Sequence, residues 1–484
     1  MICLTLMESS LDADLEILGK YRSFIDMVEL RLDMLMDPIL VSPELVKLKL
    51  KIPAIITYRR KKEGGKYEGS EKYRKKVLNT FAKTGFNFID LEMGTSFSEI
   101  EESALKNGTR IIRSYYNFKG VPDNLEGIIR KLASRPGEIP KLAVYPVNST
   151  ETLMFFRVFE KVKDIKDKII LGMGVYGLPS RILYKKLGSM FSYCSIQGNR
   201  GDPGQLNPED IKNLYRVTSI NKSTAVFGII GNPVMHSQSP QLHNKAYQRA
   251  SINAVYIPFL VDNISRFFNL ANVLKIDGFS VTVPHKINII EYLDEKSPEI
   301  NSIMSCNTVI RKGEIWKGFN TDPEGFLRPL LSRIDMASFN NCAVIGAGGA
   351  ARAVISALKS IGKEVSIFNR SLQKAEKLAN ETNSSFYPFT DQELLSDFDL
   401  IVQTTTVGMS PLVNETPLPG YKFRKGQFVY DIIYTPLKTK FLVDAEASGA
   451  VIIGGMEMLT TQGIKQFELF TNLPFPSEEQ KGSF

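Results

Sequence analysis

The sequence predicts an α/β protein of two parts, an N-terminal (β/α)8 barrel and a C-terminal unit made of two α/β lobes. One observation is that eight short β-rich runs recur within residues 1–215, with helical patterns between them. The other is a strand, a glycine-rich turn and a helix that follow one another near residue 345. A chain of 484 residues is long enough for two or three domains.

The β-rich runs of the first part are predicted to be the barrel strands. They are Met1–Met7, Met27–Leu35, Ala54–Arg59, Phe88–Met93, Arg110–Phe118, Lys141–Val147, Ile169–Val175 and Tyr193–Gln197. Between them, Tyr73–Thr84 and Thr150–Lys161 carry helical 3.6-residue patterns. Such a series fits a compact (β/α)8 barrel, a fold whose size range starts near ~200 residues. A doubly wound open sheet is the alternative.

Charged side chains gather at the predicted strands, where a barrel places its chemistry. The period of two puts Glu29, Arg31 and Asp33 on one face of the second strand. Other charged or polar groups lie in or after later strands: Arg59, Asp90, Glu92, Lys141, Arg181 and Gln205. Each alone is compatible with an internal salt bridge, but together they form a ring of Arg and acids around Lys141. Because burial and nearby cations lower the pKa of a lysine, we expect the Lys141 amine to be free to attack a ketone.

The second part begins after a short polar join at residues 216–223. A predicted strand, Thr224–Ile230, leads into a Gly- and Pro-containing turn, and a Ser-Pro pair then opens a helix. The serines of this turn, Ser237 and Ser239, are either functional or simple helix caps. Further on, a strand stops at Pro284, with Lys286 just beyond it.

A dinucleotide-binding motif follows the predicted strand Asn341–Ile345. The segment Gly346–Ala351 reads G-x-G-x-x-A between a strand and a helix, which is the context that this motif requires. The glycines let a pyrophosphate approach the backbone at a helix N-terminus. The next strand ends in Asn369-Arg370, and Arg370 suits the 2′-phosphate of NADP, whereas NAD would favour an acid there. Lys374 either helps to bind this phosphate or is a solvated surface residue. NADP(H) is therefore the predicted cofactor.

Composition excludes several other classes of protein. Residues 1–220 hold 35 Lys and Arg against 27 Asp and Glu, whereas residues 221–484 hold 25 of each. No nucleic-acid-binding signature accompanies this surplus, so a small anionic substrate explains it better than a polyanion. The four Cys are scattered without a C-x-x-C pair, which together with only three His argues against a disulfide framework or a metal site. The scattered cysteines predict a reducing cytoplasm as the location. No apolar run reaches the ~18 residues of a membrane span.

Residues 1–215 resemble the type I 3-dehydroquinate dehydratases. The matching motifs, in order, are Glu29-Leu30-Arg31-Leu32-Asp33, Thr57-Tyr58-Arg59, Lys141-Leu142-Ala143, Met173-Gly174, Ser180-Arg181 and Pro203-Gly204-Gln205. The resemblance implies a barrel that dehydrates 3-dehydroquinate to 3-dehydroshikimate through a Schiff base on Lys141. It also implies that Arg181 holds the substrate carboxylate. The residues implied to bind hydroxyl groups and order the site are Glu29, Arg31, Arg59 and Gln205.

One departure concerns the general acid/base of that family, a His in a Ser-x-His-(Asp/Asn)-Phe stretch. Here residues 114–118 read Ser-Tyr-Tyr-Asn-Phe, so Tyr116 takes the His position, and no His precedes residue 236. A tyrosine has a pKa near ~10 against ~6.5 for His, so it is a poor base unless cationic surroundings depress that value. Glu63 loses its partner, and Gly201 stands where bacterial members carry Ser. Three interpretations stay open: a slow dehydratase, proton transfer by Tyr116 or water, or a barrel that only binds.

Residues 224–484 resemble shikimate dehydrogenase. The matching segments are His236–Pro240, Val281–Lys286, Asn307-Thr308, Asn320–Asp322, Thr405–Met409, Asp431–Pro436 and Gly454–Gly463. The resemblance implies a substrate lobe at 224–330, a Rossmann NADP lobe at 331–453 and a C-terminal segment, 454–484, that returns to the substrate lobe. Ser280 replaces the usual Asn of the family.

The second resemblance also implies a site. Lys286 and Asp322 would form the catalytic pair, with the cationic Lys giving a proton to the alkoxide. Substrate contacts are implied for Ser237, Ser239, Thr282, Asn307, Asp322, Tyr434 and Gln462. Cofactor contacts are implied for Gly346, Ala347, Gly348, Gly349, Ala350, Asn369, Arg370, Lys374 and Gly455.

Together the two resemblances imply a bifunctional enzyme of the shikimate pathway, in which the product of the first half is the substrate of the second. The alternative is an NADP-dependent shikimate dehydrogenase whose barrel is weakly active or only a binding or structural module. Quinate is an alternative substrate, although the Ser239 hydroxyl, placed where a larger ring substituent would need room, favours shikimate. The expected partners are small molecules, with neither nucleic acid nor membrane among them.

Overall fold

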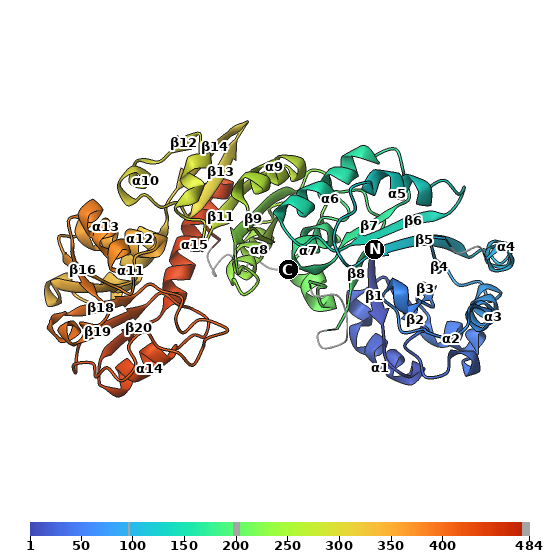
Figure 1. Ribbon diagram of the computed structural model, residues 1–484, viewed down its shortest axis with the longest axis horizontal. Helices are drawn as coiled ribbons and strands as arrows, with labels where there is room; N and C mark the ends of the chain where they lie inside the picture. Colours follow the sequence, from blue (N-terminus) through green and yellow to red (C-terminus); the bar gives the residue numbers. More distant parts are fainter. Residues whose placement is uncertain (95–96, 197–203, 477–484) are drawn as a thin grey trace. The chain divides into compact units, whose positions relative to one another are not determined.

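The computed structural model describes residues 1–94, 97–196 and 204–476 (Figure 1). These residues form two compact units. Residues 1–226 with 253–275 make up the first unit, and the other described residues make up the second. Within the described ranges, no helix is both long enough and apolar enough to cross a membrane.

Eight parallel strands form the sheet of the first unit, in the order β7-β6-β5-β4-β3-β2-β1-β8. Their bounds are β1 Ile2–Leu6, β2 Met27–Arg31, β3 Ala54–Thr57, β4 Phe88–Glu92, β5 Arg110–Asn117, β6 Ile139–Val144, β7 Ile169–Gly172 and β8 Ser192–Cys194. The segments that enter β7 and β8 are joined, because the Met190 N–H donates to the Lys168 carbonyl at 2.8 Å. The predicted barrel is therefore confirmed, and the open-sheet alternative is wrong.

Seven α-helices alternate with the eight barrel strands along the described chain, and they lie outside the strands (Figure 1). They are α1 Leu11–Tyr21, α2 Pro43–Leu50, α3 Glu71–Ala82, α4 Ser98–Lys106, α5 Leu125–Leu132, α6 Ser149–Lys161 and α7 Gly174–Ile182. Five of them begin at a side chain that accepts a free backbone N–H of the first turn, as such caps do. These caps are Ser10, Ser42, Ser70, Asn124 and Asn148.

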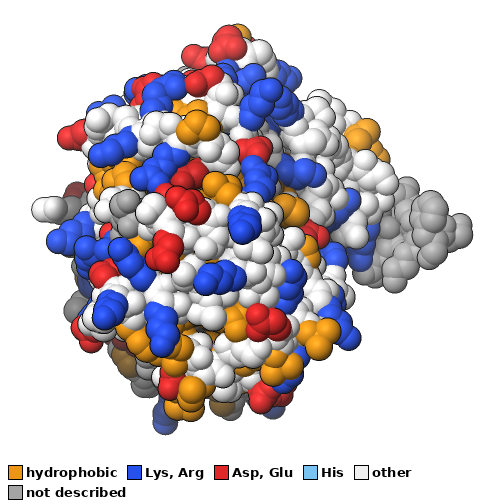
Figure 2. Space-filling model, turned by 90° about the vertical axis from the view of Figure 1, so that its right-hand side faces the viewer, with side chains coloured by type: hydrophobic (Ala, Val, Ile, Leu, Met, Phe, Trp, Pro, Cys, Tyr) orange, Lys and Arg blue, Asp and Glu red, His pale blue; other side chains and the backbone are white. Residues whose placement is uncertain are grey.

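Apolar side chains fill the barrel interior, and the charged ones lie on the strands at their carboxyl ends. One buried cluster includes a residue from each of the eight strands: Cys3, Met27, Ile55, Phe88, Ile112, Ile139, Ile169 and Tyr193. On the outer surface, Lys and Arg are mixed with Asp and Glu over the face that Figure 2 shows. The positive surplus on this face is spread out and forms no single patch.

A second sheet, in the order β10-β9-β11-β13-β14-β12, carries the first residues of the second predicted site. Its strands are β9 Ala225–Gly231, β10 Ala254–Leu260, β11 Ile276–Val281, β12 Glu295–Lys296, β13 Thr308–Lys312 and β14 Ile315–Phe319. The helices of this region are α8 Ser239–Arg249, α9 Ile264–Leu274 and α10 Pro298–Ile303. The C-terminal helix α15, Gly455–Thr471, packs against α8, β11 and β13. Residues near the end of the chain thereby reach a site begun far earlier in the sequence.

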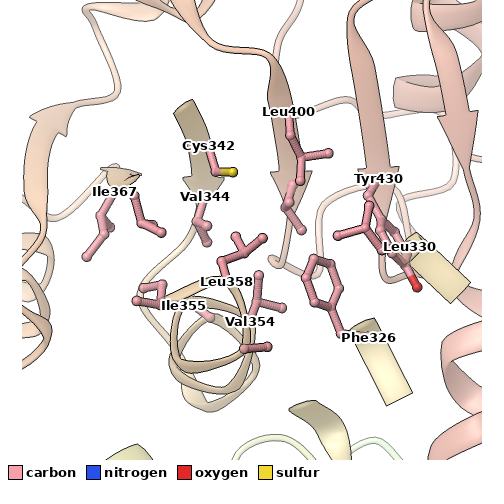
Figure 3. Packing of buried hydrophobic residues seen from close by; sticks show 14 of the residues in the cluster. Phe326, Leu330, Cys342, Val344, Val354, Ile355, Leu358, Ile367, Leu400 and Tyr430 are labelled. Carbon is pink, nitrogen blue, oxygen red and sulfur yellow. The ribbon is translucent and has the colours of Figure 1, made fainter. Parts of the chain in front are cut away.

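The third sheet is parallel, in the order β17-β16-β15-β18-β19-β20, which is the doubly wound nucleotide-binding order 3-2-1-4-5-6. Its strands are β15 Asn341–Ile345, β16 Glu364–Asn369, β17 Ser385–Pro388, β18 Leu400–Gln403, β19 Phe428–Asp431 and β20 Val451–Ile453. The helices are α11 Asp322–Arg333, α12 Gly349–Ser360, α13 Leu372–Thr382 and α14 Lys440–Ala447. Figure 3 shows the apolar face of α12, with Val354, Ile355 and Leu358, against Val344 and Leu400 of the sheet.

The order of this sheet fixes where a ligand binds. The strand order reverses between β15 and β18, and open α/β sheets bind ligands at the carboxyl ends of the strands beside such a switch point. The glycine-rich turn leaves β15 at this place. The predicted Rossmann lobe is thus confirmed in its topology.

Candidate active sites

A cavity of about 280 Å³ lies at the carboxyl ends of the barrel strands. It is lined by every residue predicted for the site of the first unit: Glu29, Arg31, Arg59, Tyr116, Lys141, Arg181 and Gln205. They come from different elements, because all strands of a parallel barrel end on one face. Of the motif at 203–205, Pro203 lies outside the described residues, as does Gly201.

Lys141 is the centre of a buried charge network at the wall of this cavity. Its Nζ lies 2.9 Å from Asp90 Oδ2 and 3.3 Å from Glu29 Oε1, and the side chain is 1% exposed. Arg59 Nη2 in turn lies 3.1 Å from the same Asp90 oxygen and 3.7 Å from Glu29 Oε1. Two cations thus face two carboxylates, so the buried network is balanced in charge.

The predicted low pKa of Lys141 is wrong. Burial by itself would lower the pKa, but the adjacent carboxylates of Asp90 and Glu29 raise it well above the ordinary value of a lysine. The nearby cations are evident from the sequence, whereas the contact of the two carboxylates with Nζ appears only in the structure. The free protein therefore holds Lys141 as an ammonium, and its proton must leave before the amine can attack a carbonyl.

Tyr116 lies over the same network. The Arg59 guanidinium carbon is 3.9 Å from the centre of the Tyr116 ring, and Phe118 stacks on Tyr116 at 6.0 Å. Burial raises the pKa of Tyr116 above its ordinary value, although Arg59 and Lys141 act in the opposite direction. The cationic surroundings therefore do not turn this phenol into a base at neutral pH.

Arg31 pairs with Asp33, but Asp33 does not lie on the same strand face as the period-two spacing predicted. Strand β2 ends at Arg31, so Asp33 lies in the turn that follows, where it accepts two hydrogen bonds from the Arg31 guanidinium at 2.9 and 2.7 Å. Asp33 also accepts the backbone N–H groups of Arg59 and Lys66. Asp33 therefore orders the loops around the cavity and holds Arg31 at its wall.

A second cavity, of about 220 Å³, lies in the second unit. It is lined by all eight residues predicted to form the catalytic pair or to contact the substrate there: Ser237, Ser239, Thr282, Lys286, Asn307, Asp322, Tyr434 and Gln462. Of the predicted cofactor contacts, Ala350 and Gly455 reach this cavity. The other seven lie outside its lining.

Lys286 and Asp322 form a close pair in this cavity. Lys286 Nζ lies 2.5 Å from Asp322 Oδ2, and the two side chains are 16% and 5% exposed. Asn307 Nδ2 donates to the other carboxylate oxygen of Asp322 at 2.8 Å. The pair is therefore mostly buried and oriented, unlike the exposed ion pairs that contribute little.

Tyr434 contacts the turn that carries the two serines. Its hydroxyl is hydrogen-bonded with Ser237 and with the backbone of Gln238, and burial raises its pKa. Ser239, the first residue of α8, is 3% exposed and lies on the same cavity wall. Hydroxyl groups from two distant segments thus converge on one end of the cavity.

The glycine-rich turn is shaped for a close ligand. Gly346 has a φ of +115°, and a Cβ there would lie 2.6 Å from Thr404 Oγ1. A Cβ on Gly349, the first residue of α12, would lie 2.9 Å from Lys286 Cβ, so this helix begins beside the Lys286–Asp322 pair. Gly348 caps α12 without a side chain, which leaves the first N–H groups available to an anion.

The residues predicted to contact the rest of the cofactor lie at the end of the next strand, β16, and on the helix that follows it. Strand β16 pairs in parallel with β15, so Asn369 and Arg370 come beside the turn that contains Ala347. Arg370 and Lys374 are exposed. A pyrophosphate cradle with an Arg at the adjacent strand end fits NADP(H). Among the described residues, no group of three or more His, Cys, Asp or Glu is placed to hold a metal ion.

Comparison with known proteins identifies the family. The family model of type I 3-dehydroquinase matches residues 2–222, that of the shikimate dehydrogenase substrate binding domain matches 229–309, and that of shikimate/quinate 5-dehydrogenase matches 331–433. The chain is also 34% identical to the chloroplastic bifunctional 3-dehydroquinate dehydratase/shikimate dehydrogenase of Arabidopsis thaliana, over 99% of this chain and 83% of that protein. The chain belongs to this bifunctional family.

The dehydrogenase unit has close relatives of its own. The shikimate dehydrogenase (NADP(+)) of Bacillus cereus strain G9842 is 39% identical over 257 residues, which are 51% of this chain and 92% of the relative. A solved shikimate dehydrogenase in complex with NADP+ is 37% identical, with a TM-score of 0.50, and the match covers 54% of this chain and 94% of that one. Both resemblances read from the sequence are thereby confirmed.

Sequence reasoning left one functional residue of each unit of this bifunctional protein out of the predicted sites. In the dehydratase unit, Asp90 holds both Lys141 and Arg59, and Ser114 donates to Asp90 at 2.5 Å. The sequence placed Asp90 in the ring of charged groups around Lys141 but assigned it no role in the site. In the dehydrogenase unit, Gln466 lines the cavity one helical turn after Gln462. In the sequence, the spacing of four residues between Gln462 and Gln466 could have indicated that Gln466 also lies at the site.

Proposed function

We propose that the chain catalyses two successive reactions, the dehydration of 3-dehydroquinate to 3-dehydroshikimate in the barrel and the NADPH-dependent reduction of 3-dehydroshikimate to shikimate in the second unit. The observation that carries this proposal is that each unit holds one lysine against a carboxylate at the wall of a cavity, Lys141 beside Asp90 and Lys286 beside Asp322. Two coupled assays on the full chain test it, one for each reaction.

In the barrel, Lys141 is the proposed nucleophile. Its ammonium passes a proton to Asp90, Glu29 or water, and the neutral amine attacks the ketone carbon with loss of water. The resulting iminium withdraws electrons while a proton leaves the adjacent carbon and the hydroxyl group departs. Hydrolysis then releases the product and the lysine. Arg181, buried at the cavity wall, is the proposed partner of the substrate carboxylate.

Replacing Tyr116 with His is expected to raise kcat for dehydration at pH 7 at least tenfold, since proton transfer by a positioned group is typically worth ~10²–10⁴-fold. The reason is that burial keeps the Tyr116 phenol protonated at this pH, whereas an imidazole with a pKa near ~6.5 can accept a proton. The measurement is the steady-state rate of 3-dehydroshikimate formation. Tyr116→Phe is the control, and a large loss on removing the hydroxyl would show that Tyr116 itself moves the proton.

In the dehydrogenase unit, Lys286 is the proposed proton donor. NADPH, when bound, supplies the hydride that reduces the ketone. Lys286 then gives a proton to the substrate oxygen, and Asp322 orients the ammonium through their close contact. The proposed substrate contacts are Ser237, Ser239, Thr282, Asn307, Tyr434 and Gln462, and Gly346, Gly348 and Gly349 form the proposed pyrophosphate cradle.

Arg370→Ala is expected to raise KM for NADPH about tenfold to a hundredfold, since hydrogen bonds to charged groups contribute ~1.5–3 kcal/mol. KM for NADH should change little, because NADH lacks the 2′-phosphate that Arg370 is proposed to bind. Steady-state kinetics with both cofactors measures the ratio. Lys377→Ala, which removes an exposed lysine of helix α13 outside the predicted cofactor contacts, is the matched control. An equal change with both cofactors would contradict the assignment of Arg370 to the 2′-phosphate.

Two finer points belong to the same proposal. Shikimate is preferred over quinate, because the tightly buried Ser239 hydroxyl at the cavity wall leaves little room for a further ring substituent. The chain works in a reducing compartment, the cytoplasm, because its four cysteines are buried free thiols.

A further inference from the structure

Helix α15 sends a second glutamine into the dehydrogenase cavity. Gln466 is 2% exposed, and its carboxamide is hydrogen-bonded at both ends. The Ser280 hydroxyl donates to Gln466 Oε1 at 2.7 Å, while Gln466 Nε2 donates to Thr308 Oγ1 at 3.0 Å and to the Asn307 carbonyl at 3.3 Å. The imidazole of His243, whose pKa burial lowers to about 3, also interacts with the Gln466 side chain.

These hydrogen bonds have a direction. A threonine hydroxyl carries one proton, and that of Thr308 is donated to Asn307 Oδ1 at 2.7 Å. Thr308 Oγ1 must therefore accept from Gln466, and it can do so because the Nε2 end of the carboxamide faces it. Ser280 maintains this orientation, since its own proton occupies the Oε1 end.

The donor and acceptor roles in these hydrogen bonds also determine which end of the Asn307 carboxamide faces the catalytic pair. Asn307 Oδ1 accepts from Thr308 and from the Thr321 backbone N–H at 2.9 Å, so the Asn307 carboxamide cannot rotate without losing both bonds. Its Nδ2 is thereby held toward Asp322 Oδ1 at 2.8 Å, while Asp322 Oδ2 contacts Lys286. A donor at position 466 thus sets which group Asn307 presents to Asp322 and to the cavity.

We propose that Gln466 is a positioning residue of the dehydrogenase unit, which acts through Thr308 to fix the orientation of the Asn307 carboxamide. This inference rests on the proposed shikimate dehydrogenase reaction. It also accounts for Ser280, where the family usually has Asn, because the Gln466 carboxamide lies directly beside the short Ser280 side chain. Gln466 and Ser280 are therefore complementary, because the serine hydroxyl donates to the carboxamide oxygen of the glutamine.

Gln466→Glu is the sharpest test, because the substitution keeps the size of the side chain and reverses one hydrogen bond. A carboxylate accepts only, so Thr308 would have to donate to it and release Asn307. We expect kcat/KM for shikimate oxidation by NADP+ at pH 8 to fall by about twofold to 150-fold, as for the loss of one or two hydrogen bonds of ~0.5–1.5 kcal/mol each. KM for NADP+ and the rate of dehydration should stay unchanged.

The pH dependence separates positioning from packing. When protonated, the carboxyl group that Gln466→Glu introduces has one acceptor and one O–H donor, the same pattern as the glutamine, so the defect of the variant should shrink as pH falls toward 6. The titratable groups around this position are His243 on α8 and, beyond Asn307, Asp322 and Lys286. The wild-type protein carries the same three groups, so the ratio of variant to wild-type kcat/KM removes their contributions.

Gln466→Met and Glu468→Gln complete the design. The methionine keeps the volume without imposing a reversed bond, so its kcat/KM should lie between those of the wild-type and Gln466→Glu proteins, which also provides a result if the glutamate variant does not fold. Glu468→Gln, on the same helix, should match the wild type. Equal kcat/KM in all four proteins, or a Gln466→Glu defect independent of pH, would overturn the positioning role. A wild-type chain that does not oxidise shikimate would instead overturn the proposed function.

Discussion

Replacing Lys286 with Met is expected to lower kcat for NADPH-dependent reduction of 3-dehydroshikimate by about 10²–10⁴-fold, the range that a positioned proton donor supplies. The physical reason is that Lys286 Nζ, held 2.5 Å from Asp322 Oδ2, is a cationic donor at the cavity wall. Methionine keeps much of the stem volume and removes the proton. The measurement is the decrease in NADPH absorbance under saturating substrate.

The dehydration rate of the same Lys286→Met preparation is the internal control. It should equal that of the wild type, because the described residues that line the barrel cavity all belong to the first unit. Lys377→Met, which removes an exposed lysine of helix α13 outside the predicted cofactor contacts, controls for the loss of one positive charge. Turnover near that of the wild type in Lys286→Met would mean that another group donates the proton.

Borohydride treatment in the presence of 3-dehydroquinate is expected to trap a covalent adduct on Lys141 of the full chain. Lys141→Met should lose both this adduct and the dehydration, with the rate falling to the uncatalysed background, because Lys141 carries the one amine among the described residues of the cavity lining. Peptide mapping by mass spectrometry locates the adduct.

Lys168 supplies the matched control for this trapping experiment. It is also a buried lysine of the barrel, 4% exposed, but its ammonium donates to the Ile165 carbonyl and lies outside the cavity lining. It should carry no adduct. An unmodified Lys141 together with measurable dehydration would exclude the Schiff base, and absence of both would favour a barrel that only binds.

Much of the fold could be predicted from local patterns. The eight barrel strands lie where the β-rich runs are, for example Met27–Arg31 within the predicted Met27–Leu35, because alternation and β-branched content reflect contacts between near neighbours. The predicted ends of the strands were less accurate than their positions. Asp33 continues the period-two spacing beyond Arg31, but its hydrogen bonds to the Arg59 and Lys66 backbones hold it in a turn.

The residues of both cavities could also be predicted, for a topological reason. Once a segment is assigned to a parallel barrel or a doubly wound sheet, the ends of its strands must meet on one face. Glu29 and Lys141 are 112 positions apart in the chain, yet both belong to that face and their side chains lie 3.3 Å from each other. The same rule brings the Gly346 turn beside Arg370.

The sequence by itself determined the two families, the order of the two units, and which lysines line the cavities. Only the tertiary structure decided the protonation of Lys141, because a pKa depends on which charges touch the group, and Asp90 and Glu29 touch Nζ. The role of Gln466 likewise follows only from the tertiary structure. The direction of a hydrogen bond depends on the partners of both ends of a carboxamide, and those of Gln466 come from β11, β13 and the adjoining Asn307.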